Sequence, residues 1–185
     1  MKKLFLLLSL VFSSTAWAQL HVDLGSGITH VDSPYPGTGA SVGCFVDAGY
    51  RLTLSEKLVL DPILQLSWQG EKEYGTLYVK MPVILSYRLG RVELGAGPYV
   101  AYGLWDKKNE ERYYYERPPH PWSRSAFGYF RRFDLGLSAR TTFHFQSLYC
   151  GIEGYYGLLD VADKDWWEQF SARNMGISLL IGHLF

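Results

Sequence analysis

The stretch NMGISLLIGHLF, from Asn174 to Phe185, decides the fold. Its odd positions, from Met175 to Phe185, are apolar except for His183, whereas its even positions are small or polar apart from two leucines. Side chains of a β-strand point alternately to opposite faces, so this period of two predicts a strand with one apolar face. Such a strand is a poor edge for a soluble sheet, but a closed barrel has no edge.

Seven earlier segments show the same alternation and are predicted strands: residues 20–30, 40–52, 58–69, 77–88, 92–104, 129–143 and 148–158. Short turns follow the second, fourth and sixth of them, at Ser55–Lys57, Gly90–Arg91 and His144–Ser147, and longer loops follow the others. Outer-membrane barrels have an even number of strands, short periplasmic turns and longer external loops. The sequence therefore predicts an all-β fold, an eight-stranded antiparallel transmembrane β-barrel, over residues 19–185. Pro62 and Pro98 fall inside predicted strands and leave the register near them open.

Residues 1–18 have the pattern of a secretory signal peptide. Lys2 and Lys3 precede an apolar run that ends at Phe12, and Ala16-Trp17-Ala18 has the small-x-small form of a cleavage site. The apolar run is too short to span a membrane as a helix, which needs about 20 residues. We expect cleavage after Ala18 and export to the outer membrane, with an uncleaved anchor as the alternative.

The composition fits strands with one apolar and one polar face. Hydrophobic residues make up 48% of the chain and aromatic residues 16%, yet the mean hydropathy is only -0.06. The formal net charge of +0 gives no reason to expect a nucleic-acid partner. Cys44 and Cys150 fall on the apolar faces of separate strands, so we favour two free, lipid-facing residues over a disulfide. No Cys/His spacing suggests zinc, and no metal or cofactor is predicted.

The polar faces of the predicted strands carry both acids and bases. An eight-stranded barrel is only wide enough for side chains to fill, so these charges should pair across the lumen and leave no open pore. The predicted interior charges are Asp47, Arg51, Asp61, Lys80, Arg88, Glu93, Asp134, Arg140 and Glu153. A soluble barrel such as a lipocalin, or a soluble sandwich, would instead bury its apolar face.

Aromatic residues on the apolar faces fall near the strand ends, as in the two interfacial girdles of a membrane barrel. The predicted periplasmic girdle contains Tyr50, Tyr87, Phe143 and Phe185, and the predicted outer girdle contains Trp68, Tyr102, Tyr129 and Tyr156.

Two stretches, Tyr78–Arg88 (YVKMPVILSYR) and Leu94–Tyr99 (LGAGPY), are the most specific motifs of the chain. With Phe133–Leu137, Tyr155–Leu158 and the terminal strand, they make the chain resemble the small outer-membrane β-barrel domain family that includes the PorT-like proteins. The resemblance implies an eight-stranded outer-membrane barrel and, through the PorT-like members, a connection to protein secretion. It implies no enzymatic activity, and no residue transfers the secretion role to this chain.

The sequence offers no credible set of serine, histidine and acid for catalysis. It contains no His-x-Ser, and His30 with Asp32 and Ser33 is better explained as loop polarity. His183 is interpreted as an interfacial residue. We therefore expect a non-enzymatic structural or interaction role, accessory to secretion or envelope assembly. The alternative is a lipid-modifying enzyme of the lipid A deacylase or acyltransferase type.

The longest loop, predicted from about Asp106 to Ala126, carries the candidate binding surface. Tyrosine, tryptophan and arginine are common in binding hot spots, and this surface consists of Tyr113, Tyr114, Tyr115, Arg117 and Trp122. We favour a solvated loop among lipopolysaccharide head groups, and a dedicated partner site is the alternative. Expected partners are outer-membrane lipid and lipopolysaccharide, the barrel-assembly machinery through the strand ending at Phe185, and an envelope or secretion protein.

Overall fold

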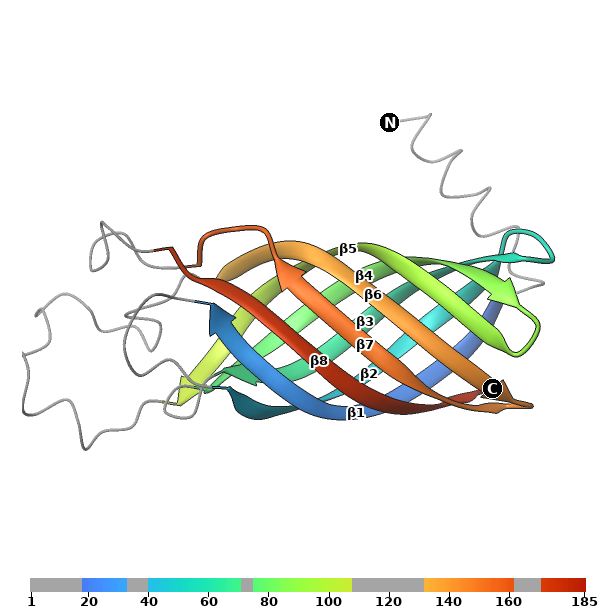
Figure 1. The fold of residues 1–185 in the computed structure, drawn as a ribbon, viewed down its shortest axis with the longest axis horizontal. Helices are drawn as coiled ribbons and strands as arrows, with labels where there is room; N and C mark the ends of the chain where they lie inside the picture. Colours follow the sequence, from blue (N-terminus) through green and yellow to red (C-terminus); the bar gives the residue numbers. More distant parts are fainter. Residues whose placement is uncertain (1–17, 33–39, 71–74, 108–131, 162–170) are drawn as a thin grey trace, which may run out of the picture.

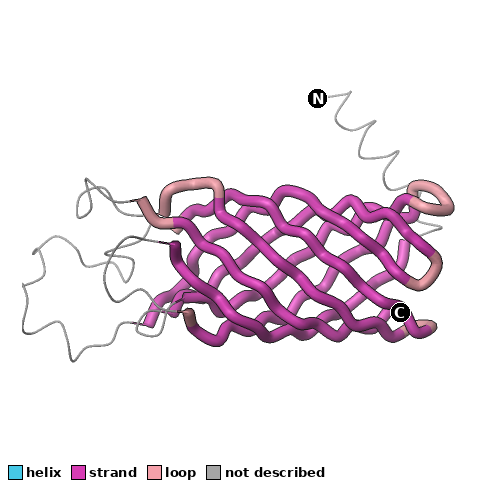
Figure 2. The backbone as a smooth tube through the Cα atoms, viewed as in Figure 1, coloured by secondary structure: helices cyan, strands magenta, loops and turns pink. Residues whose placement is uncertain are grey.

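Eight antiparallel strands close into a barrel in which each strand pairs with the next and β8 pairs with β1 (Figure 1). The computed structural model describes residues 18–32, 40–70, 75–107, 132–161 and 171–185. The strands are β1 (Ala18–Asp32), β2 (Ser41–Thr53), β3 (Leu58–Gly70), β4 (Gly75–Leu89), β5 (Val92–Lys107), β6 (Phe133–Phe145), β7 (Leu148–Gly157) and β8 (Arg173–Leu184). This architecture confirms the predicted fold class. The strands run obliquely to the long axis, as barrel closure requires (Figure 2). In the described part of the chain, no helix is long and apolar enough to cross a membrane.

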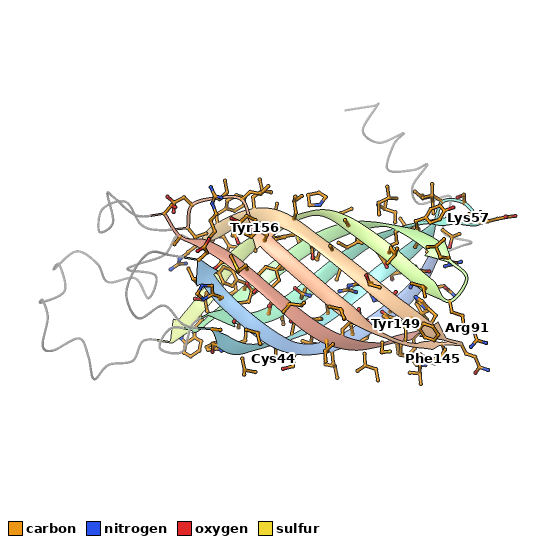
Figure 3. All side chains as sticks on the ribbon, viewed as in Figure 1. Cys44, Lys57, Arg91, Phe145, Tyr149 and Tyr156 are labelled. Atoms are coloured by element: carbon orange, nitrogen blue, oxygen red, sulfur yellow. The ribbon has the colours of Figure 1, made fainter. Side chains whose placement is uncertain are left out.

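The barrel is apolar outside and polar inside. In β2, the side chains of Phe45 and Asp47 are buried, whereas those of Val42 and Val46 are exposed. The same alternation runs through the other strands, and large exposed aliphatic and aromatic side chains cover the outer wall (Figure 3). A soluble barrel places its apolar residues the other way round, so this arrangement excludes the lipocalin-like alternative.

Three short turns lie at the barrel end that also holds Phe185 (Figure 1). The β4–β5 turn uses Gly90 at φ 64°, a left-handed conformation that glycine adopts readily. The β6–β7 turn is shorter than predicted. His144 and Phe145 continue β6 because they pair with β7, so only two residues remain for the turn, and Gln146 takes φ 60°.

The predicted start of the longest loop needs correction, and the predicted start of the sixth strand lies outside the described residues. The predicted loop from Asp106 starts later, because Asp106 and Lys107 still pair with β4. Residues 33–39, 71–74, 108–131 and 162–170, and with them Tyr129, are not among the described residues, and neither are residues 1–17.

The prolines leave the register intact. Pro62 pairs with Val83 and Pro98 pairs with Leu137, each in line with the rest of its ladder. The register shift instead lies between β4 and β5, at Leu77/Tyr78, where β5 contains one extra residue. Such a bulge lets two consecutive residues of β5, at positions 104 and 105, both remain exposed on the outer wall.

Aromatic side chains are exposed near both ends of the barrel. Tyr50 and Tyr87 lie near the short turns, while Tyr102 and Tyr156 lie toward the opposite end. The ring of Trp68 packs on that of Trp105, with centroids 5.6 Å apart. Both cysteines are free and exposed, as predicted; Cys44 is labelled on the outside of the wall in Figure 3.

Candidate functional site

Arg140, on β6, is the hub of a buried charge network. Its Nη1 donates to Asp23 Oδ2 on β1 at 2.6 Å, and its Nη2 donates to Asp47 Oδ2 on β2 at 3.0 Å. Nη2 also lies 2.5 Å from Glu153 Oε2 on β7, and the Gln65 amide donates to both Asp47 and Glu153 at 3.3 Å. One guanidinium thus joins four strands, including strands on opposite sides of the lumen.

Lys80 extends this network toward the opposite end from the short turns. Its Nζ donates to Glu153 Oε1 at 3.3 Å. The ammonium also lies 4.5 Å and 4.0 Å from the ring centroids of Tyr99 and Tyr155, which supply cation–π contacts. The lysine is 1% exposed, so it holds a buried charge satisfied entirely by side chains of the barrel.

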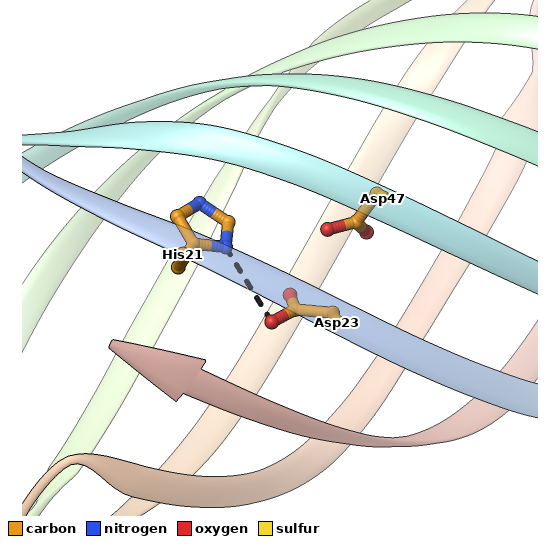
Figure 4. Close-up of side chains that lie close together, drawn as sticks. All are labelled: His21, Asp23 and Asp47. Carbon is orange, nitrogen blue, oxygen red and sulfur yellow. Dashed lines mark hydrogen bonds and ion pairs between the residues drawn. The ribbon is translucent and has the colours of Figure 1, made fainter. Parts of the chain in front are cut away.

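His21 extends the network toward the short turns. Its Nε2 lies 3.1 Å from Asp61 Oδ1, and its Nδ1 lies 3.4 Å from Asp23 Oδ1 (Figure 4). The Tyr149 hydroxyl donates to the same Asp23 oxygen and lies 3.1 Å from Nδ1. We call these nine side chains the central cluster: His21, Asp23, Asp47, Asp61, Gln65, Lys80, Arg140, Tyr149 and Glu153.

A second group, the rim cluster, lies at the short-turn end and consists of Arg51, Arg88, Glu93 and His144. Glu93 forms ion pairs with Arg51 from β2 and with Arg88 Nε, the latter at 2.8 Å. His144 lies 3.6 Å from Glu93 and stacks on Tyr149, which links this group to the central cluster. The Arg88 side chain is 36% exposed, so this pair is in partial contact with solvent.

A third group lies toward the loop end. The Tyr99 hydroxyl donates to Asp134 Oδ2 at 2.9 Å, and the Asn174 amide donates to the same oxygen at 3.0 Å. The Asn174 amide also lies 3.5 Å from the Tyr78 hydroxyl. Neutral donors therefore hold this carboxylate.

Glycines make room for the large side chains of the lumen. A Cβ atom on Gly136 would overlap the Tyr99 ring, and one on Gly182 would overlap Tyr149 and Asp23. Gly95 faces Ser86 and Ile84 in the same way. Because these glycines have no Cβ atom, large neighbouring side chains can fill the interior.

The structure places the nine predicted interior charges on the inner side of the wall. Eight are buried, and Arg88 is partly exposed. Asp47, Asp61, Lys80, Arg140 and Glu153 meet in the central cluster, Arg51, Arg88 and Glu93 meet in the rim cluster, and Asp134 joins Tyr99 and Asn174. The predicted loop surface, Tyr113, Tyr114, Tyr115, Arg117 and Trp122, lies outside the described residues.

Sequence reasoning missed several members of the central cluster. His21 and Asp23 alternate with Leu20, Val22 and Leu24, and this pattern alone assigns them to the inner face. Gln65 and Tyr149 carry no charge, so a search for charged residues passes over them.

The described side chains of the lumen offer paired charges and an imidazole. His21 lies between two carboxylates, Asp23 and Asp61, and its side chain is buried. His21, Asp23 and Asp47 do offer one ligand atom each, all within 4.8 Å of one another, which is a set that a metal ion could use.

No protein-family model matches this chain, and no curated protein matches it in sequence. Among solved structures, Neisserial surface protein A is similar with a TM-score of 0.59 and 12% identity, over 91% of this chain and 99% of that one. Ail, the attachment invasion locus protein of Yersinia pestis, is similar with a TM-score of 0.53 and 12% identity, over the same shares. The fold is that of a small outer-membrane β-barrel. At this identity, the likeness concerns the fold alone.

Proposed function

We propose that the protein is an integral outer-membrane barrel without an open pore, which acts through its structure and its surface and not through catalysis. The observation that carries the proposal is the Arg140 hub, which ties strands from opposite sides of a filled lumen. The apolar outer wall adds to it, because a soluble protein rarely exposes so large an apolar surface.

The two ends of the barrel support an orientation. Short turns face the periplasm in outer-membrane barrels and longer loops face outward. We place the β2–β3, β4–β5 and β6–β7 turns in the periplasm. The start of β1 at Ala18 and the end of β8 at Leu184 lie on the same side. Export by a signal peptide cleaved after Ala18 belongs to this proposal.

The filled lumen argues against transport. Lys80 of β4 pairs with Glu153 of β7, and Arg140 of β6 pairs with Asp47 of β2, so these ion pairs cross the lumen. An ion crossing the lumen would have to break buried pairs that have little water to replace them. We therefore expect the barrel to block ions and small solutes.

The biological role that we favour is interaction at the envelope. Loops on a rigid scaffold carry much of protein function, and the proposed binding surface is the loop containing Tyr113–Tyr115, Arg117 and Trp122. The PorT-like resemblance makes an accessory role in secretion or envelope assembly our specific suggestion. Lipopolysaccharide around the barrel and the barrel-assembly machinery at β8 are the other proposed partners.

Membrane fractionation tests the location. The protein should remain in the outer-membrane fraction after carbonate washing and should migrate differently on gels before and after heating. Recovery in the soluble periplasmic fraction would contradict the proposal.

Two further experiments test the lack of transport and catalysis. Planar-bilayer recordings should show no steady conductance from the unmodified protein, and a steady large conductance would overturn the closed lumen. Mass spectrometry should find the same lipid A acyl pattern with and without the protein, whereas a changed pattern would favour a lipid-modifying enzyme.

Crosslinking in intact cells tests the loop surface. We expect at least one crosslinked protein to be lost when residues 108–123 are deleted, which leaves β5 intact. If every crosslinked protein survives the deletion, the loop is not the binding surface.

A further inference from the structure

Two carboxylates face each other directly across β1 and β2. Asp23 and Asp47 are cross-strand partners, and both side chains are buried. Like charges in this position repel unless a cation lies between them. Arg140 takes the Oδ2 atom of each carboxylate, which leaves the two Oδ1 atoms for other partners.

The Oδ1 atoms of Asp23 and Asp47 and the imidazole of His21 have fewer hydrogen-bond donors around them than they could accept from. Asp47 Oδ1 is buried without a hydrogen-bond partner. Asp61 accepts from His21 Nε2, so in the neutral imidazole Nδ1 keeps its lone pair. The Tyr149 hydroxyl has one hydrogen, which it donates to Asp23 Oδ1. In that neutral form, His21 Nδ1 faces the Asp23 carboxylate as an electron donor (Figure 4).

The charge of the central cluster points the same way. Its four carboxylates are Asp23, Asp47, Asp61 and Glu153, and its fixed cations are Arg140 and Lys80. Neighbouring charges do not make up the difference. Arg51 and Arg88 share Glu93, which leaves one positive charge in the rim cluster, but Asp134 adds a further negative charge. The described interior thus holds six acids and four fixed cations, and two positive charges are still missing. Buried charge without compensation is costly. A proton on His21 would supply one positive charge, whereas a divalent cation supplies both that are missing.

We propose that His21 Nδ1, Asp23 and Asp47 bind one divalent transition-metal ion, with Zn²⁺ as the best fit and the Tyr149 oxygen or a water as fourth ligand. Zinc accepts imidazole nitrogen and carboxylate oxygen together. Arg140 and Asp61 then act as the outer partners that orient the ligands. Zinc holds ligand atoms about 3.3 Å apart in a tetrahedron. The three ligand atoms lie within 4.8 Å of one another, so binding requires them to approach one another by up to about 1.5 Å.

Metal content after refolding tests the site. The wild-type barrel is refolded in detergent with and without Zn²⁺, freed of loose metal by a weak chelator and measured by mass spectrometry. We expect about one zinc per chain. The variants His21→Gln and Asp47→Asn should each retain at least about tenfold less, because each removes a ligand. Asp134→Asn is the matched control, since Asp134 is a buried carboxylate of the same lumen that is held by Tyr99 and Asn174, and the change should leave zinc binding unchanged.

X-ray absorption of the wild-type zinc form keeps the test valid if a variant fails to fold. It should show one imidazole and otherwise oxygen ligands at about 2.0–2.2 Å. A wild-type barrel that retains no zinc overturns the proposal and leaves a proton as the compensating cation. Sulfur ligation, or an equal loss of zinc in Asp134→Asn, overturns it as well.

Discussion

Leu179 and Leu180 are neighbours in β8, yet one lies outside the barrel and the other inside. The side chain of Leu179 is 68% exposed, and that of Leu180 is 4% exposed. On the outer wall, Leu179 pairs with Ile152 of β7 and Ser26 of β1, whereas Leu180 packs with Phe45 and Tyr149 in the lumen. One strand therefore borders two environments, and the effect of a substitution on stability depends on whether its side chain points into the lumen or out of the barrel. Charge is needed inside and excluded outside.

The largest effect is expected inside, from Arg140→Met. The change leaves Asp23, Asp47 and Glu153 without their shared cation, and breaking a buried pair in this way costs about 3–5 kcal/mol. Urea titration of the barrel refolded into lipid vesicles, followed by the heat-modifiable gel band, measures the free energy of unfolding. A loss below about 1 kcal/mol would mean that the hub contributes little more than a surface pair.

The outer face gives the opposite result, because adding a charge there is the costly change. Leu179→Arg places a cation in the middle of the proposed lipid-facing band, at a cost of about 2–4 kcal/mol. Leu89→Arg, at the short-turn end of β4, is the matched control and should cost about 0–1 kcal/mol. Equal costs at the two positions in the same urea assay would argue against a membrane around the barrel.

Glycine-to-alanine variants compare the inner and outer faces without changing any charge. Gly182→Ala should cost about 1–3 kcal/mol, because the added methyl overlaps Tyr149 and Asp23 in the filled lumen. Gly154→Ala, on the outer face, meets no atom closer than 3.8 Å and should leave stability nearly unchanged. If the two variants unfold at the same urea concentration, the lumen is less tightly packed than the structure indicates.

The smallest effect is expected from Arg88→Met in the rim cluster. Its side chain is 36% exposed, and Glu93 keeps its pair with Arg51, so the loss should stay within about 1 kcal/mol. Measured beside Arg140→Met, this variant separates the depth of an ion pair from its mere presence. A loss as large as that of Arg140→Met would show that depth is not what matters.

The alternation of apolar and polar residues was enough to predict the strands and their faces. It assigned Asp47 and Arg140 to the interior because a strand offers only two sides. It misplaced the end of β6, since His144 and Phe145 differ little from turn residues until their pairing with β7 is known.

The partners inside the lumen could not be predicted. Arg140 meets Asp23 from the first strand, and that contact depends on how far the strands are staggered when the sheet closes. The sequence does not show this stagger. The proposed ligand set was missed for the same reason, because Asp47 joins His21 and Asp23 only through the pairing of β1 with β2.

The pairing of β1 with β8 has a consequence for how the protein is made. Its register joins His21 to Leu184 and Asp32 to Arg173, so the seam connects the most distant described segments of the chain. Contacts of such high sequence separation form late and slowly. Until β8 arrives, β1 presents a bare row of amide and carbonyl groups that any other strand could occupy. The growing barrel is therefore open to mispairing along its first strand until β8 completes the seam.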